Sequence, residues 1–223
     1  MSAWLLRVDQ FLRRDSALTN RRARDVVRAQ LAIILLCGAL YGAVMGSYNG
    51  LAGDGWKQVL LSATKVPILF FVTFLLCLPS YFVFNVLAGL HADFPRVLNA
   101  LLSFQSLASI VLASLAPITG LMNISTTNYG FIVLWSGIMF AVASALGHWR
   151  MRQEYRALIA GHPRHRQLLR VWTTLYVFVG IQMAWVLRPF VGDPTKPFQI
   201  VRPSAWGNAY VEVIELVLRV FGH

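Results

Sequence analysis

The sequence predicts an all-α protein: a polytopic bundle of five transmembrane helices, with an amphipathic helix at the membrane surface at each terminus. Three observations lead to this prediction. Of the 223 residues, 57% are hydrophobic and only 13% are charged, whereas roughly 25% of the residues of a soluble domain are charged. Five uncharged segments are long enough to cross a hydrocarbon core, which takes about 20 residues of helix. The basic residues alternate in number from one connection to the next.

The five predicted spans contain no Asp, Glu, Lys or Arg. They cover residues 31–51, 66–90, 97–119, 129–149 and 171–187. The bilayer core offers no water to the backbone, so each span must satisfy its own hydrogen bonds as a helix. We therefore predict three parts: a basic cytoplasmic tail (1–30), a transmembrane domain (31–188), and an external loop with a final amphipathic helix (189–223).

Each terminal part contains one helix with two distinct faces. In the first part an apolar face is formed by Trp4, Leu5, Val8, Phe11 and Leu12. This helix is expected either to lie in the headgroup layer or to pack on the cytoplasmic end of the bundle. The second helix covers 208–221 and is too short to span a membrane. It is expected to lie on the outer surface or to dock against the bundle.

The distribution of basic residues predicts the orientation. Seven arginines precede the first span, one lies between the second and third, and six lie between the fourth and fifth; the other side carries six Lys or Arg. By the positive-inside rule the N-terminus is cytoplasmic and the C-terminus is external. Anionic lipid headgroups are the expected partners of this charge. The candidate headgroup contacts are Arg13, Arg14, Arg164, Arg166 and Arg188. No nucleic-acid partner is predicted, because no recognition motif accompanies the charge.

Two stripes of small residues are candidates for helix packing. The first span carries Gly38, Gly42, Gly46 and Gly50 at a strict spacing of four residues. The fourth span carries Gly137, Ala141 and Ala145 at the same spacing. Such stripes let another backbone approach closely. For the glycines, the partner is either another helix of this chain, or a second copy or a different protein.

Three amides fall inside the spans and are candidate intramembrane polar groups: Asn85, Gln105 and Gln182. They are expected either to hydrogen-bond between helices or to line a small polar cavity. All nine carboxylates lie outside the predicted spans. Ion-coupled transporters usually hold ionisable groups at membrane depth, so this distribution argues against that class. Cys37 and Cys77 lie inside spans and are predicted to be buried free thiols.

No catalytic residue, cofactor or metal site is predicted, and we expect the protein not to be an enzyme. Of the five histidines, only His91 and His148 lie near the same membrane boundary and could form a ligand pair. The basic turn at 161–166, which holds two histidines, is predicted to face lipid headgroups. No nucleophile–base motif occurs. An enzymatic role in headgroup chemistry would depend on Arg188 and the external loop alone.

The segment after the fifth span has a recognisable pattern. It contains Met-Ala-Trp-Val-Leu-Arg-Pro-Phe-Val-Gly at 183–192, Pro-Phe-Gln at 197–199 and Gly-Asn-Ala-Tyr at 207–210. This pattern resembles that of small bacterial inner-membrane proteins, and the topology is similar to that of Yip-type membrane-organising proteins. The resemblance implies a bacterial inner (cytoplasmic) membrane location.

We expect a non-enzymatic assembly subunit or membrane organiser whose partner is itself or another membrane protein. The alternative is a passive channel, a scramblase or a lipid-handling protein.

Overall fold

The computed structural model describes residues 23–50, 55–187, 190 and 191. Its long elements are α2 (Ala23–Gly46), α3 (Gly55–Leu87), α4 (Phe94–Ser125), α5 (Tyr129–Gly161) and α6 (Arg164–Val186). Two short 3-10 helices, η2 (Ser47–Asn49) and η3 (His91–Asp93), lie in the connections. All five long helices are long and apolar enough to cross a membrane. The prediction of an all-α protein with five helices able to span a membrane is therefore confirmed for the described residues, while both predicted terminal helices lie outside them.

Most of the helices extend beyond the apolar segments that predicted them. α3 and α5 have 33 residues each, which corresponds to about 50 Å at 1.5 Å per residue. Their ends therefore project past a hydrocarbon core of roughly 30 Å. α2 instead ends at Gly46, earlier than predicted, and Gly50 follows with a φ of 76°. Only glycine adopts that conformation without strain.

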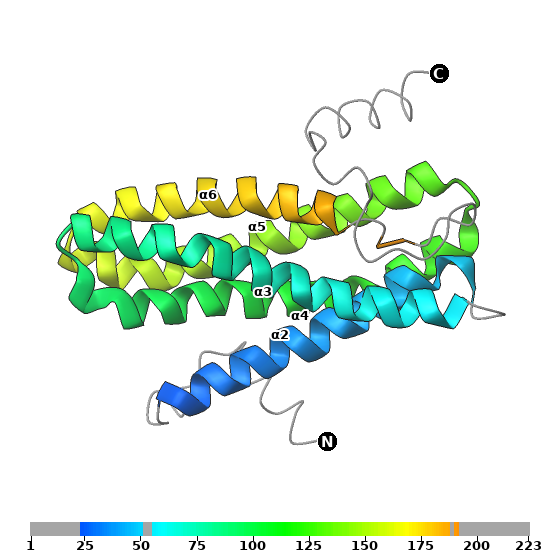
Figure 1. Cartoon of the computed structure of the whole chain (residues 1–223), viewed down its shortest axis with the longest axis horizontal. Helices are drawn as coiled ribbons and strands as arrows, with labels where there is room; N and C mark the ends of the chain where they lie inside the picture. The colour runs from blue at the N-terminus through cyan, green and yellow to red at the C-terminus, as the bar shows by residue number, and fades with distance from the viewer. Residues whose placement is uncertain (1–22, 51–54, 188–189, 192–223) are drawn as a thin grey trace.

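The five helices form a ring in which each packs against two neighbours. The order around the ring is α2, α4, α5, α6 and α3, and α3 makes little contact with α4 across it. α5 and α6 make the least extensive contact of the five neighbouring pairs. Figure 1 shows the helices aligned along one long axis, with α2 inclined to the others. The ring is thus tight at most interfaces and loosest between α5 and α6.

The two ends of the bundle differ in charge. One end carries the start of α2, the α3–α4 connection and the α5–α6 connection, with the exposed side chains of Arg28, Arg96, Arg164 and Arg166. We call it the basic end. The opposite end carries η2, the α4–α5 connection, and Phe190 and Val191 after α6. The midsections of the helices are apolar outside, with exposed residues such as Leu36, Leu40, Leu75, Leu76 and Ile138.

The interior holds more polar groups than the outer surface suggests. Fifteen polar or charged residues among those described are buried, including Gln30, Lys65, Asn85, Gln105 and His165. In a membrane protein the lipid-facing side must be apolar, and polar side chains gather where helices meet. The described residues therefore combine an apolar exterior with a polar interior, the distribution expected of an integral membrane protein.

Candidate functional site

The main cavity of interest lies between α5 and α6 in the half of the bundle away from the basic end. Its volume is about 720 Å³, within the range of about 300–1,000 Å³ typical of small-molecule sites. All five long helices contribute to the lining, as do Phe190 and Val191 after α6. The lining is almost entirely apolar, and its described residues include no charged side chain.

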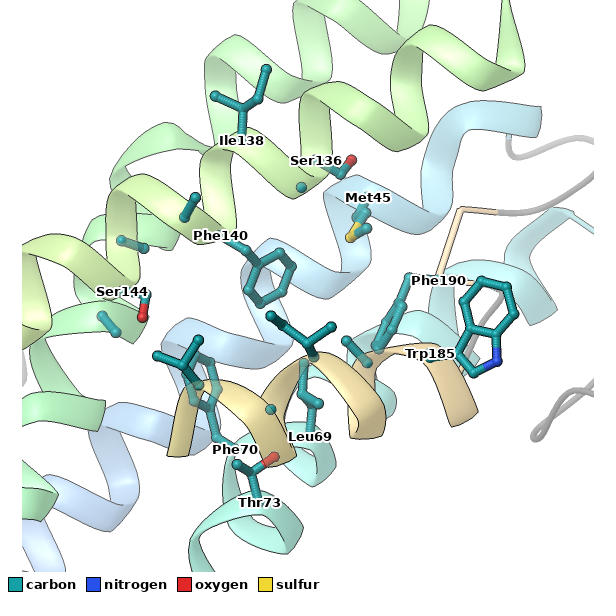
Figure 2. A pocket seen from close by; sticks show the side chains of 18 of the residues that line it. Met45, Leu69, Phe70, Thr73, Ser136, Ile138, Phe140, Ser144, Trp185 and Phe190 are labelled. Carbon is teal, nitrogen blue, oxygen red and sulfur yellow. The ribbon is translucent and has the colours of Figure 1, made fainter. Parts of the chain in front are cut away.

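The cavity opens on the side of the bundle. Its rim is formed by side chains that are well exposed, such as Ile138 on α5 and Val177 on α6, at 48% and 42%. Its floor is formed by side chains that are at least nine-tenths buried, among them Leu69, Phe70 and Phe104. Figure 2 shows Phe140 from α5 and Phe190 reaching into the same space. Because the rim lies along the midsections of spanning helices, the opening faces the side that lipid would occupy.

The segment after α6 closes the end of the cavity opposite the basic end. Phe190 and Val191 are 7% and 2% exposed and line the cavity. The backbone carbonyl of Phe190 accepts hydrogen bonds from the hydroxyl of Ser62 and, at 3.4 Å, from the amide of Gln58. The carbonyl of Val191 accepts one from the hydroxyl of Tyr129 at 3.4 Å. Donors on α3 and α5 thus hold this segment across the bundle.

A hydrogen-bonded group lies at the floor of the cavity. The amide Nε2 of Gln105 on α4 donates to the backbone carbonyl of Phe70 on α3 at 2.9 Å and to the hydroxyl of Tyr176 on α6 at 3.0 Å. Tyr176 also lines the cavity, and its ring packs edge-on against Phe104 with centroids 4.9 Å apart. Gln105 is fully buried and joins three helices at the centre of the ring.

A second polar group lies inside the basic end. The hydroxyls of Tyr81 and Tyr155 hydrogen-bond to each other, and the amide of Asn85 donates to the Tyr81 carbonyl at 2.9 Å. His165 is fully buried, and its Nε2 lies 3.2 Å from Asp93 Oδ2. The basic turn at 161–166 was predicted to face lipid headgroups, but His165, in the first turn of α6, points into the bundle, where its ring packs edge-on against Tyr155.

The His165–Asp93 pair does not form the base of a catalytic arrangement within the described residues. The other ring nitrogen of His165, Nδ1, has no hydrogen-bond partner there, whereas a nucleophile activated by histidine must lie within hydrogen-bond reach of it. His91 is exposed and His148 is buried, with Nδ1 of His148 2.8 Å from the Ser144 carbonyl. The ligand pair considered from the sequence is therefore not assembled. The described residues contain no group of three metal-ligating side chains.

Lys65 is an ionisable residue that sequence reasoning placed wrongly. The sequence predicts Lys65 to lie before the second span, among the six Lys or Arg of the external side, but α3 already begins at Gly55 and Lys65 is only 1% exposed. It shares a helix face with Gln58 and Ser62, which lie seven and three residues before it. Buried ionisable groups in membrane helices commonly mark functional positions. Hydropathy could not reveal this one, because it reports composition and not the direction of a side chain.

The glycines of α2 lie against α3. A Cβ on Gly42 would be 2.3 Å from the Ser62 carbonyl oxygen, and one on Gly46 would be 2.9 Å from the Gln58 carbonyl oxygen. At Gly38 the nearest atom would be Pro67 Cγ at 3.3 Å. Of the four glycines predicted for this stripe, only Gly50, which follows α2, has no neighbour within 4 Å in the described structure. Three of the four predicted glycines therefore lie where α2 and α3 approach most closely.

The small residues of α5 are placed differently. Gly137, Ala141 and Ala145 are all exposed, and a Cβ on Gly137 would meet no described atom within 4 Å. Gly137 and Ala141 line the cavity. The tight packing predicted for Gly137 is instead found at Gly147, where a Cβ would be 2.8 Å from the Phe104 carbonyl oxygen. The rotation of α5, which the spacing did not reveal, explains this difference.

The remaining predicted residues are scattered. Asn85 and Gln105 are fully buried in the two polar groups, whereas Gln182 is half-buried on α6 and does not line the cavity. Arg164 is exposed and donates to the Ala88 carbonyl at 3.3 Å, and Arg166 is exposed. The other headgroup candidates, Arg13, Arg14 and Arg188, lie outside the described residues.

The two cysteines are buried and free, in separate apolar clusters.

Comparisons with protein-family models, curated proteins and solved structures found no significant match to this chain.

Proposed function

We propose that this integral membrane protein is a lipid-handling protein that binds an apolar, membrane-dissolved molecule in the cavity between α5 and α6. The observation that carries the proposal is the combination of a buried apolar floor with an exposed apolar rim. A molecule already dissolved in the bilayer reaches such an opening without crossing water. In lipid there is little hydrophobic gain on binding, so affinity would come from close packing against the walls. The aromatic side chains of the floor supply that packing surface.

One of the observations that favoured the competing role in assembly no longer favours it. The glycine stripe of the first span motivated that role, but Gly38, Gly42 and Gly46 lie against α3 of the same chain. What remains for a second copy or another membrane protein is the exposed stripe of Gly137, Ala141 and Ala145 on α5. Part of that stripe lies at the cavity, so lipid binding and assembly would compete for the same face.

One pair of substitutions separates the two roles. Ala141 and Ala145 are both exposed on α5, but only Ala141 lines the cavity. We expect Ala141→Phe to reduce labelling by a photoreactive fatty acid several-fold, because the ring occupies the cavity mouth. Ala145→Phe should leave labelling unchanged. If neither variant changes labelling while Ala145→Phe converts an oligomer to a monomer in detergent sizing, assembly is the better description.

For the orientation, we infer that the basic end faces the cytoplasm of a bacterial cell and contacts anionic headgroups. The support is the exposure of Arg28, Arg96, Arg164 and Arg166 at that end, because membrane proteins hold basic residues on the cytoplasmic side. A cysteine at the exposed position Thr127 should react with a membrane-impermeant maleimide in whole cells. A cysteine at the exposed position His162 should react only after lysis. The reverse pattern would overturn the orientation.

A further inference from the structure

The floor of the cavity offers hydrogen-bond donors at a depth where few lipids carry polar groups. Tyr176 lies near the midpoint of α6 and Thr73 near the midpoint of α3, and both line the cavity. The two helices pack closely here, since a Cβ on Gly180, one turn after Tyr176, would be 3.7 Å from Thr73 Cγ2. Tyr176 and Thr73 therefore lie on neighbouring helices in the same wall of the cavity, close to the middle of the membrane.

Neither hydroxyl donates its hydrogen to an acceptor among the described residues. The oxygen of Tyr176 accepts from Gln105, whose Nε2 is fixed as the donor because it also serves the Phe70 carbonyl. No acceptor for the Tyr176 hydrogen is found in the described part of the chain. Thr73 is 1% exposed, and its Oγ1 has no partner among the described residues. A buried hydroxyl left without a hydrogen-bond acceptor is energetically unfavourable. A ligand that brings an acceptor to these hydroxyls would remove that cost.

The surroundings restrict the chemistry of the acceptor. No charged side chain lines the described cavity, and an ionised group without a partner is strongly disfavoured in an apolar site. The acceptor must therefore be neutral, and two hydroxyl donors suit a carbonyl oxygen. The rings of Phe70, Phe104 and Phe140 line the same space. Aromatic side chains of this kind pack well against a flat ring.

We propose that the ligand is a lipophilic quinone, a flat ring with neutral carbonyl oxygens and one apolar tail. This inference depends on the proposed function and specifies its ligand. The ring would lie on the floor with a carbonyl at Tyr176 and Thr73, and the tail would leave through the opening between α5 and α6. A diacyl phospholipid fits less well, because its carbonyl groups stay near the headgroups. A single fatty chain would fill the cavity without using the hydroxyls.

Two photoreactive probes test the inference on the full-length protein in lipid nanodiscs. One is an azido-benzoquinone with a decyl tail, and the other is a diazirine-bearing fatty acid. Crosslinked residues are mapped by mass spectrometry, with an excess of unlabelled decyl-benzoquinone as competitor. We expect competitor-sensitive quinone labelling of cavity residues. Labelling by the fatty acid alone would overturn the quinone assignment and leave the proposed function standing. Labelling by neither probe would overturn both.

Isosteric variants then test the two hydroxyls. The double variant T73V/Y176F should lose about tenfold in quinone labelling, since each missing hydrogen bond weakens binding several-fold. Its fatty-acid labelling should stay within about twofold of the wild type. The matched control is T119V/Y41F, which removes two fully buried hydroxyls outside the cavity and should change neither signal. Equal quinone labelling of both double variants would show that Tyr176 and Thr73 do not hold the ligand.

Discussion

Two helix interfaces of this protein are lined by small residues, yet one is closed and the other is open. At the α2–α3 interface, Gly42 and Gly46 bring two backbones so close that a single added Cβ would collide with a carbonyl oxygen. Between α5 and α6, Gly137 and Ala141 on one helix and Gly180 and Ala184 on the other line a cavity. Small residues therefore permit close approach without enforcing it.

The difference lies in what the opposite helix presents. α2 meets a part of α3 where Ser62 and Pro67 are short or compact side chains and lie directly against the glycines. α6 is held away from α5 at both ends. Near the basic end, Tyr81 of α3 lies between them: its ring packs against Trp172 of α6 with centroids 5.0 Å apart, and its hydroxyl hydrogen-bonds to that of Tyr155 of α5. Phe190 and Val191 line the opposite end of the cavity. Large side chains at the ends thus keep the small residues in the middle apart.

The largest effect is expected from Gly42→Ala. The new Cβ would lie 2.3 Å from the Ser62 carbonyl oxygen, and because backbone cannot move aside locally, α2 and α3 must separate. We expect a loss of about 3 kcal/mol in the free energy of unfolding, at the upper end of overpacking costs. The shift in the midpoint of SDS-induced unfolding measures it. An unchanged midpoint would mean that α2 and α3 are not in close contact.

Gly147→Ala tests a second close approach, between α5 and α4. Its Cβ would lie 2.7 Å from Phe104 Cδ2 and 2.8 Å from the Phe104 carbonyl oxygen. The ring can rotate, but the carbonyl cannot, so we expect a loss of about 2 kcal/mol. The same SDS titration applies. A loss as small as that of a surface alanine substitution would place the rotation of α5 in doubt.

Gln105→Leu removes the hydrogen-bonded link at the centre of the ring. Leucine is of similar size, but the Tyr176 hydroxyl would lose its donor and the Phe70 carbonyl its additional bond. We expect a loss of about 1.5 kcal/mol, because buried polar groups left unpaired are costly. A double-mutant cycle with Tyr176→Phe should show coupling between the two positions. Strict additivity would argue that the side chains do not interact.

The smallest effect is expected from Gly137→Ala, the counterpart of Gly42→Ala on the open side. No described atom lies within 4 Å of the new Cβ, so the substitution only replaces a flexible helix residue by a stiffer one. We expect unfolding free energy to rise by about 0.5 kcal/mol. A destabilisation comparable with that of Gly42→Ala would mean that α5 and α6 are in closer contact than the structure has them.

The spans were predictable because a membrane-spanning helix requires a long uncharged segment, and the sequence alone shows where such segments lie. Segments without charge between Arg96 and Arg150 can only be helices in a bilayer. The rotation of each helix was not predictable in the same way. Gly42 and Gly137 belong to two similar stripes of small residues, and only the position of the surrounding helices distinguishes a contact from a cavity. His165 illustrates the same point, since its neighbours in sequence are basic and exposed while it is buried.

The hydroxyl groups at the cavity floor escaped sequence reasoning for a different reason. Thr73 and Tyr176 are ordinary residues of apolar helices, and neither spacing nor composition marks them. They become notable only because Gln105, which was predicted as a polar group within a span, uses the Tyr176 oxygen and leaves its hydrogen free. A candidate site of this type depends on three helices meeting, and no local pattern encodes such a meeting.

The sideways opening of the cavity affects how any binding constant should be expressed. A ligand that arrives from within the bilayer is diluted by lipid and not by buffer. Doubling the lipid at fixed amounts of protein and ligand would halve occupancy at low saturation, while doubling the aqueous volume would leave it unchanged. Mole fraction in the membrane is therefore the natural concentration scale for this protein.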